Sequence, residues 1–331
     1  MILRKNIAIL ATGGTIAGSG FAANSSKYSS AQISIENLIP TISGINKLAN
    51  ISGEQLLSVG SQNIDDGAWL KISKRVNGLL GQSNVDGVVV AHGTDTLEET
   101  AYFLNLTVKS SKPVVMVGSM RPSTALGADG AINLYNAVAL ATDAQAHNKG
   151  VLVVMADKIF AARDVSKINA SSIEAFAAPN CSAIGHIHYG KAQIYYQPLR
   201  IHTSKSQFDV DNVPSLPKVD IIYMHSEFDD NIIDFLVESQ TKAIVLASFG
   251  DGNVSENVLQ KLISAREKGV LIIKSSRSGA GFVEANIEID DDKHGFVAAD
   301  NLNPQKARIL TKLALTKIEN LTKIKEIFTN Y

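Results

Sequence analysis

Short apolar runs alternate with amphipathic segments along most of this chain, and no other feature restricts its fold as strongly. The apolar runs predict buried strands at 6–11, 86–91, 113–118, 150–155, 219–224, 242–248 and 269–274. Helix-like segments lie between or after them at 66–80, 96–108, 131–145, 229–239, 254–267 and 304–317. Strands that alternate with helices form βαβ units, whose sheets are mainly parallel and carry helices on their faces. We therefore predict an α/β fold.

The alternation changes after about residue 186. Residues 187–196 are typical of an antiparallel hairpin that turns at Gly190, and 197–218 carry three prolines among polar residues without a clear period. A boundary is expected where the pattern is lost. We predict a larger N-terminal domain over 1–196, with a mostly parallel, doubly wound sheet and a β-hairpin near its end. A linker over 197–217 and a smaller, flavodoxin-like parallel α/β domain over 218–331 follow.

Composition excludes several classes of partner. The 331 residues carry a net charge of −1 without a basic block, which argues against binding to nucleic acid or to anionic membranes. The mean hydropathy of +0.07 is typical of a globular chain with a substantial core, and no apolar run approaches the roughly 20 residues that cross a bilayer. Cys181 is the single cysteine, so no intrachain disulfide is possible. The apolar run near the start is too short for a signal peptide. We expect a cytoplasmic protein as the sequence is given, or a periplasmic one if this is a processed form.

One strand–turn–helix segment, residues 85–108, contains the first candidate site. The β-branched run at 88–90 predicts a strand that is buried on both faces. Thr96 and Glu99 have the spacing of a capping box, in which the threonine hydroxyl bonds the Glu99 amide and the glutamate reaches back. The apolar face of the helix that follows is predicted to consist of Leu97, Ala101, Leu104 and Val108.

The turn between that strand and helix brings a hydroxyl next to a carboxylate. Thr94 and Asp95 would lie at the carboxyl end of a parallel strand, which is where open α/β sheets bind their ligands. His92 precedes them and is interpreted as a packed or hydrogen-bonded turn residue rather than as a base. We predict that this turn forms half of an active site.

A second turn follows the first strand. The pair Gly13-Gly14 allows a sharp turn that holds the Thr15 hydroxyl close to a ligand, but it does not supply the spacing of a dinucleotide-binding loop. Residues 17–31 are rich in small side chains and are interpreted as a mobile lid that carries Tyr28 over the site. Lys167 follows the strand at 150–155, and a lysine held near Thr94 can accept a proton when it is partly desolvated.

These segments carry a resemblance that covers nearly the whole chain. Thr12-Gly13-Gly14-Thr15-Ile16-Ala17 and His92-Gly93-Thr94-Asp95-Thr96 resemble the two threonine motifs of the bacterial L-asparaginase family, specifically its type II enzymes. Further matching segments are Gly60-Ser61-Gln62, Lys112–Gly118, Met120-Arg121-Pro122, Asn133–Ala137, Ser275-Ser276-Arg277 and Asn303–Arg308.

The resemblance implies an amidohydrolase that converts L-asparagine to L-aspartate and ammonia through a threonine acyl-enzyme. Thr15 would be the nucleophile and Tyr28 would assist its deprotonation, while Thr94, Asp95 and Lys167 would form a second catalytic group. The residues implied for substrate binding are Gly60, Ser61, Gln62, Thr94, Asp95, Asn253 and Glu288. The family also implies a homotetramer built as a pair of close dimers, with Asn253 and Glu288 lent by the partner chain. No metal and no organic cofactor are expected.

Two alternatives remain open at this stage. Asp251 stands where the family commonly has asparagine, which leaves the preference for asparagine over glutamine undecided. A pocket separates substrates that differ by one methylene by only about 1–3 kcal/mol, so a dual asparaginase–glutaminase is the nearest alternative. A non-catalytic amino-acid-binding protein, which also has two α/β lobes, is the alternative from another class.

Overall fold

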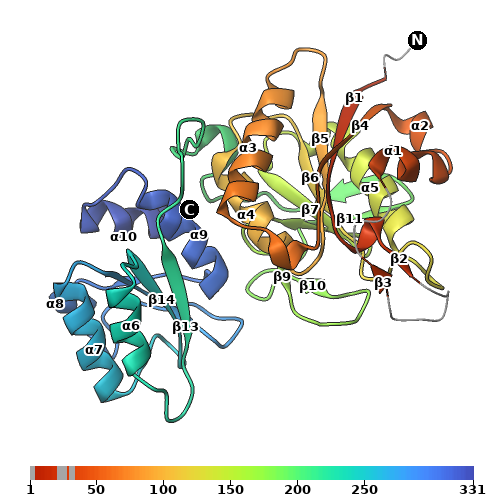
Figure 1. Cartoon of the computed structure of the whole chain (residues 1–331). Helices are drawn as coiled ribbons and strands as arrows, with labels where there is room; N and C mark the ends of the chain where they lie inside the picture. Colours follow the sequence, from red (N-terminus) through yellow and green to blue (C-terminus); the bar gives the residue numbers. More distant parts are fainter. Residues whose placement is uncertain (1–3, 21–27, 30–33) are drawn as a thin grey trace. The chain divides into compact units, whose positions relative to one another are not determined.

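The computed structural model describes residues 4–20, 28–29 and 34–331, and it divides into two compact units, Met1–Asn212 and Val213–Tyr331 (Figure 1). The division between 212 and 213 falls inside the segment 197–217 for which the sequence predicts a linker. Both units are α/β folds, as the alternation of strands and helices predicts. In the described part of the chain, no helix has the length and apolar character needed to cross a bilayer.

The first unit is built on an eight-stranded sheet with the order β12-β11-β8-β7-β6-β5-β1-β4. Strands β4, β1, β5, β6 and β7 are parallel, whereas β8, β11 and β12 join in antiparallel pairs. The strand bounds are β1 Asn6–Gly13, β4 Asn50–Val59, β5 Gly87–Ala91, β6 Val114–Val117, β7 Val151–Met155, β8 Lys158–Ala161, β11 Gly185–His188 and β12 Lys191–Ile194. The predicted hairpin is confirmed, with His188 paired to Lys191 across the Tyr189-Gly190 turn.

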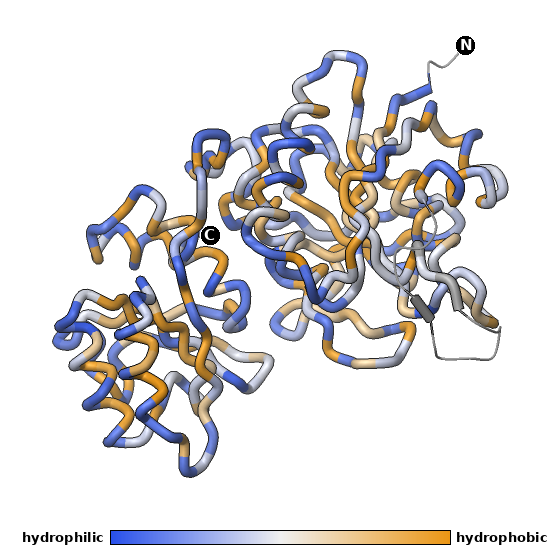
Figure 2. The backbone as a smooth tube through the Cα atoms, viewed as in Figure 1, coloured by the Kyte–Doolittle hydropathy of each residue, from blue (hydrophilic) through white to orange (hydrophobic). Residues whose placement is uncertain are grey.

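Helices cover both faces of this sheet because side chains alternate along each strand. On β1, Ile7 and Ile9 belong to one core cluster together with Leu134 of α5, whereas Ala8 and Leu10 belong to a second cluster with residues of α3 and α4. The central strands are accordingly hydrophobic along their whole length (Figure 2). The helices of the unit are α1 Ile35–Leu38, α2 Ile45–Leu48, α3 Asp66–Leu80, α4 Leu97–Thr107 and α5 Gly130–Thr142. The apolar face predicted for the helix at 96–108 is confirmed in α4.

Short elements complete the first unit. The pairs β2 Ser19–Gly20 with β3 Tyr28–Ser29, and β9 Ser166–Lys167 with β10 Phe176–Ala177, are antiparallel. Single turns of 3₁₀-helix are η1 Thr15–Ala17, η2 Ile39–Thr41, η3 Ser61–Asn63, η4 Ala144–Ala146 and η5 Thr203–Lys205. Two of these turns, η1 and η3, directly follow the parallel strands β1 and β4.

Strand β4 is absent from the sequence-based prediction. Its ten residues contain Ser52, Gly53, Glu54 and Gln55 in succession, and most of its positions are only partly buried. As the last strand of the sheet order it pairs with β1 alone, so it needs no continuous apolar run. Its position matters for the site, because β4 lies on one side of β1 and β5 lies on the other. This reversal of strand order is a topological switch point, where open α/β sheets bind ligands.

The second unit contains the parallel strands β13 Val219–Tyr223, β14 Ala243–Ser248, β15 Leu271–Ser276 and β16 Val297–Ala298, which follow one another in chain order. Its helices are α6 Asn231–Glu238, α7 Glu256–Glu267, α8 Asp291–His294, α9 Pro304–Ala314 and α10 Leu321–Asn330. Ile233 and Val258 of α6 and α7 pack in one core cluster with Leu246 and Ile272 of the sheet. Helix α9 contacts β13, β14 and β15, and it begins with Pro304 in its first turn, as predicted. Helix α10 was not predicted.

Candidate active site

The turns after β1 and β5 touch each other through two glycines. Gly13 and Gly14 both have positive φ, of 111° and 81°. A Cβ added at Gly14 would overlap the backbone of Gly93, so neither turn leaves room for a side chain at the contact. The residues that follow these glycines are Thr15 and Thr94. The two threonine turns are therefore neighbours at one end of the sheet, as the sequence predicts.

The turn after β4 joins the same cluster. The Gly14 amide donates to the Val59 carbonyl over 3.1 Å, which joins the first turn to the end of β4. Ser61 is buried, and its Oγ accepts a hydrogen bond from the Asp95 amide at 3.1 Å. The structure thus brings together the turns at Thr15, Ser61 and Thr94, each of which comes from the carboxyl end of a different parallel strand.

The hydroxyl of Thr96 does not form the predicted capping box. Thr96 is the N-cap residue of α4, but its side chain makes no capping hydrogen bond. Its Oγ1 instead donates to the Ser61 carbonyl at 2.8 Å. Three turns meet at this point. The Thr96 hydroxyl therefore donates to the carbonyl of the neighbouring turn and does not cap the amides of α4. The prediction for Thr96 was wrong, and the residue ties the Ser61 turn to the Thr94 turn.

Lys167 contacts two polar side chains of the Thr94 turn. From β9, its Nζ donates to Thr94 Oγ1 at 3.0 Å and to Asp95 Oδ1 at 2.7 Å. The Lys167 side chain is only 16% exposed, whereas that of Asp95 is 60% exposed. The ammonium is thus held on the inner side of a carboxylate that faces solvent. The hydroxyl, carboxylate and amine that the sequence predicts as one group are in direct contact.

His92 stabilises the Thr94 turn through hydrogen bonds of its buried side chain. It is fully buried, and its Nδ1 lies 2.7 Å from the Gly93 carbonyl, which can only accept. Nδ1 therefore carries the proton, and Nε2 accepts from Thr100 Oγ1 at 3.0 Å. Thr100 accepts in turn from the Trp69 indole at 3.0 Å. Burial lowers the pKa of His92 to about 4, although the bond to Gly93 opposes the shift. The imidazole is neutral and structural, in line with its interpretation as a turn residue.

The comparisons with known proteins identify the family. Residues 6–200 match the family described as "Asparaginase, N-terminal", and residues 218–328 match the "Glutaminase/Asparaginase C-terminal domain". The chain belongs to the asparaginase family. This agrees with the resemblance that its two threonine motifs indicate.

Individual members of the asparaginase family match over nearly their whole length. "L-asparaginase 2" of Escherichia coli is 46% identical, with 98% of this chain and 93% of the relative covered. "Glutaminase-asparaginase" of Pseudomonas fluorescens is also 46% identical, with 98% and 90% covered. The crystal structure of a probable cytoplasmic L-asparaginase from Campylobacter jejuni superposes with a TM-score of 0.96 at 46% identity and covers 99% of this chain and 100% of that one.

The remaining residues predicted from the asparaginase motifs differ in where they lie. Gln62 is exposed on η3 next to Ser61. The side chain of Tyr28 and most of the predicted lid at 17–31 fall outside the described residues. Asn253 and Glu288 belong to the second unit, where Asn253 pairs with Phe249 in a β-bridge and Glu288 is exposed. Their roles in the site remain predictions.

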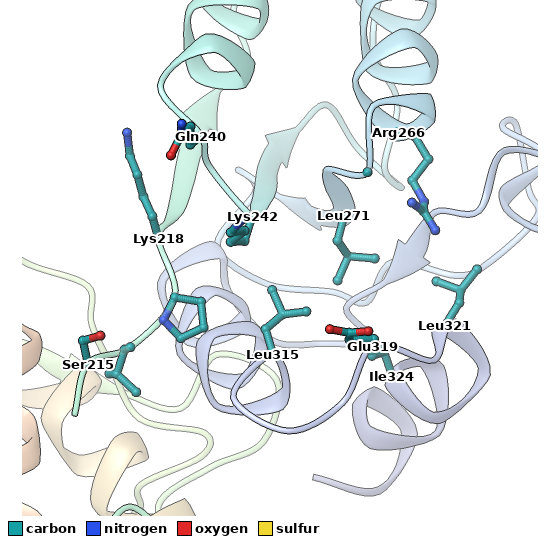
Figure 3. A pocket seen from close by; sticks show the side chains of 13 residues that line it. Ser215, Lys218, Gln240, Lys242, Arg266, Leu271, Leu315, Glu319, Leu321 and Ile324 are labelled. Carbon is teal, nitrogen blue, oxygen red and sulfur yellow. The ribbon is translucent and has the colours of Figure 1, made fainter. Parts of the chain in front are cut away.

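A cavity of about 600 Å³ in the second unit contains none of these residues. It lies at the amino ends of β13, β14 and β15, and Figure 3 shows Leu271, Leu315 and Leu321 turned toward it, with Arg266 at one side. This is the sheet edge opposite to the one where parallel strands bind ligands. Among the described residues, no three His, Cys, Asp or Glu side chains are grouped so that they could hold a metal ion.

Proposed function

We propose that this member of the asparaginase family hydrolyses L-asparagine to L-aspartate and ammonia, with Thr15 as the nucleophile. The observation that carries the proposal is the contact between the turns of Thr15 and Thr94, with Lys167 bonded to both Thr94 and Asp95. An amide is a poor electrophile with a poor leaving group, so division of the reaction through a covalent ester is favourable. The names of the matching relatives support the substrate class.

In the first step, Thr15 Oγ attacks the side-chain amide carbon of asparagine as the hydroxyl loses its proton. Tyr28 assists this deprotonation. The C–N bond then breaks, the nitrogen gains a proton and ammonia leaves, so that an aspartyl ester of Thr15 remains. In the second step, water attacks the ester carbon, which releases aspartate and returns a proton to Thr15. A positioned base contributes roughly 10²- to 10⁴-fold to steps of this kind.

The second group prepares both steps by controlling the Thr94 proton. Because Lys167 donates to Thr94 Oγ1, the Thr94 hydrogen is directed away from the lysine and can polarise the amide or orient water. Lys167 Nζ also donates to Asp95 Oδ1 at 2.7 Å, so the amine is held in a fixed position beside the Thr94 hydroxyl. The backbone amide of Thr94 is our candidate for oxyanion stabilisation, and one such donor is worth about 2.7–4 kcal/mol.

Substrate binding requires partners for two opposite charges. To remove an ammonium and a carboxylate from water costs several kcal/mol per ion unless each finds a partner. Ser61, Gln62 and the backbone of Gly60 suit the α-carboxylate, and Asp95 suits the α-ammonium. We assign Asn253 and Glu288 to the site of a neighbouring subunit within a homotetramer built from close dimers. The relatives differ in compartment, since one is named cytoplasmic and another periplasmic, so a cytoplasmic location stays a prediction.

Replacement of Thr15 tests the proposal. Thr15→Val removes the nucleophile but keeps the branched shape of the side chain, so we expect ammonia release from asparagine to fall by at least about 10³-fold. Thr15→Ser is the matched control, because it keeps the hydroxyl and should keep measurable turnover. Circular dichroism and thermal unfolding check that both variants fold. Parental turnover in a folded Thr15→Val protein would refute the assignment. Asparagine binding without ammonia release by the parent would favour an amino-acid-binding protein.

A dual asparaginase–glutaminase is the second candidate. Relatives named glutaminase-asparaginase are 43–46% identical to this chain, and the two named L-asparaginase 2 are both 46% identical, so identity does not separate the two functions. Ammonia release from glutamine and from asparagine, measured over a range of concentrations, separates the two functions through their ratio of kcat/KM.

A further inference from the structure

Two loops of the second unit are joined to each other at the carboxyl edge of its sheet. The first loop follows β14 and carries Asn253, which exchanges two backbone hydrogen bonds with Phe249, of 3.0 and 2.9 Å. The second loop follows β15 and carries Glu288. The link between them is Asp251, whose Oδ1 accepts a hydrogen bond from the Glu284 amide at 2.7 Å. A side chain of the Asn253 loop thus holds the backbone of the Glu288 loop.

A buried ion pair lies beneath both loops. Lys274 of β15 and Asp291 of α8 are each 1% exposed, and Lys274 Nζ lies 2.8 Å from Asp291 Oδ2. A Cβ at Gly252 would lie 3.3 Å from this Nζ, so the lysine lies directly below the first loop. Asp291 Oδ2 also accepts from the Asn286 amide at 2.9 Å, in the second loop. The pair therefore contacts both loops.

Stability alone does not explain this pair. Burial of two charges removes their hydration, and an apolar pair of similar volume is often as stable or more stable. The cost is increased here because Asp291 Oδ1 is buried and finds no hydrogen-bond partner among the described residues. What the pair does provide is a link between the loops, since Lys274 lies below Gly252 and Asp291 Oδ2 accepts from the Asn286 amide.

We propose that Asp251 and the pair Lys274–Asp291 are positioning residues that hold Asn253 and Glu288 in a fixed arrangement for substrate binding. The inference rests on the proposed function, in which these two residues bind asparagine. An asparagine at position 251 would keep the same contact. The bond to Glu284 requires only a side-chain oxygen of the right length, which both residues possess.

Kinetics of Asp251 variants test the first part of the inference. In Asp251→Ala the link to the Glu284 amide is lost. We expect KM for asparagine to rise about 3- to 10-fold and kcat to change by less than about 2-fold, because binding of the ground state and of the transition state weakens together. Asp251→Asn keeps the hydrogen-bond acceptor, so its KM should stay within about 2-fold of the parental KM. Glu267→Ala, which removes an exposed carboxylate from α7, is the matched control and should change neither constant.

The double variant Lys274→Met/Asp291→Leu tests the buried pair. Replacement of both partners avoids an isolated buried charge, which either single variant would create. We expect the double variant to fold and to raise KM at least as much as Asp251→Ala does. If it fails to fold, the Asp251 series decides the question alone.

Glu288→Ala, measured in parallel, distinguishes failure of this inference from failure of the proposed function. A raised KM in Glu288→Ala, together with parental KM in Asp251→Ala and in the folded double variant, would overturn the positioning role and leave the proposed function intact. An unchanged KM in Glu288→Ala, or a parent that releases no ammonia from asparagine, would overturn both.

Discussion

Acid is expected to destabilise the first unit through His92. The buried imidazole donates from Nδ1 to Gly93 and accepts at Nε2 from Thr100, so a second proton would place a charge in the core and cost the bond that Thr100 donates. Burial lowers the pKa of His92 to about 4, against about 6.5 in the unfolded chain. Between these two values the unfolded state binds more protons than the native state, so stability rises with pH and is lost as pH falls. A difference of about 2.5 pKa units corresponds to about 3 kcal/mol.

The assay compares the parent with His92→Gln by urea unfolding between about pH 7 and pH 4.5. Glutamine cannot titrate, and its side-chain oxygen can still accept from Thr100. Burial, followed by the charges of Lys205 and Lys149, also lowers the pKa of His202, which adds acid sensitivity of the same sign. The difference between the two proteins at each pH removes this contribution, because His202 is present in both.

We expect His92→Gln to be less stable than the parent at neutral pH, where it lacks the bond to Gly93, and to lose less stability as the pH falls. The gap between the two proteins should close by about 2–3 kcal/mol over the assay range. Parallel stability curves would refute the reasoning, because they would show that His92 takes up no extra proton on unfolding. An asparaginase activity that remains unaffected under acid while the curves converge would show that the Thr94 turn tolerates the change.

Two further predictions concern the chemistry and the shared site. Lys167→Met keeps the length of the side chain but removes its charge and its bonds to Thr94 and Asp95. We expect kcat for asparagine to fall about 10²-fold or more, while circular dichroism shows that the fold is retained. The control Lys158→Met, at an exposed ion pair with Glu174, should behave as the parent. At an asparagine concentration far below the raised KM of Glu288→Ala, neither Thr15→Val nor Glu288→Ala should turn over appreciably when expressed separately. Co-expression should recover about a quarter of the parental activity there, because random pairing leaves that share of shared sites intact. No recovery would mean that Thr15 and Glu288 of the same chain serve one site.

The sequence predicts most of the parallel strands of both units and their helices α3, α4, α5, α6, α7 and α9, because a strand covered on both faces must be apolar along its length. Val88, Val89 and Val90 of β5 are an example, and all three are completely buried. It also predicts the turns that carry Thr15 and Thr94, because glycines and capping residues interrupt the apolar pattern there. The same reasoning misses β4, whose apolar content is low because it pairs with β1 alone. The antiparallel strand β8 was not predicted, although most of its residues are buried.

The arrangement of the site depends on strand register, which the composition of the segments does not determine. Ala11 of β1 pairs with Ala91 of β5 as the last pair between the two strands, and their glycine turns meet just beyond it. The register on the other side of β1 shifts between Ala11 and Gly13, and this irregularity places Gly13 opposite Val59. A shift of one residue in either pairing would separate Gly14 from Gly93 and break the bond between Ser61 and the Asp95 amide. The hydroxyls, carboxylate and amine are visible in the sequence as residue types, but their convergence is a consequence of three parallel strands ending together at a switch point.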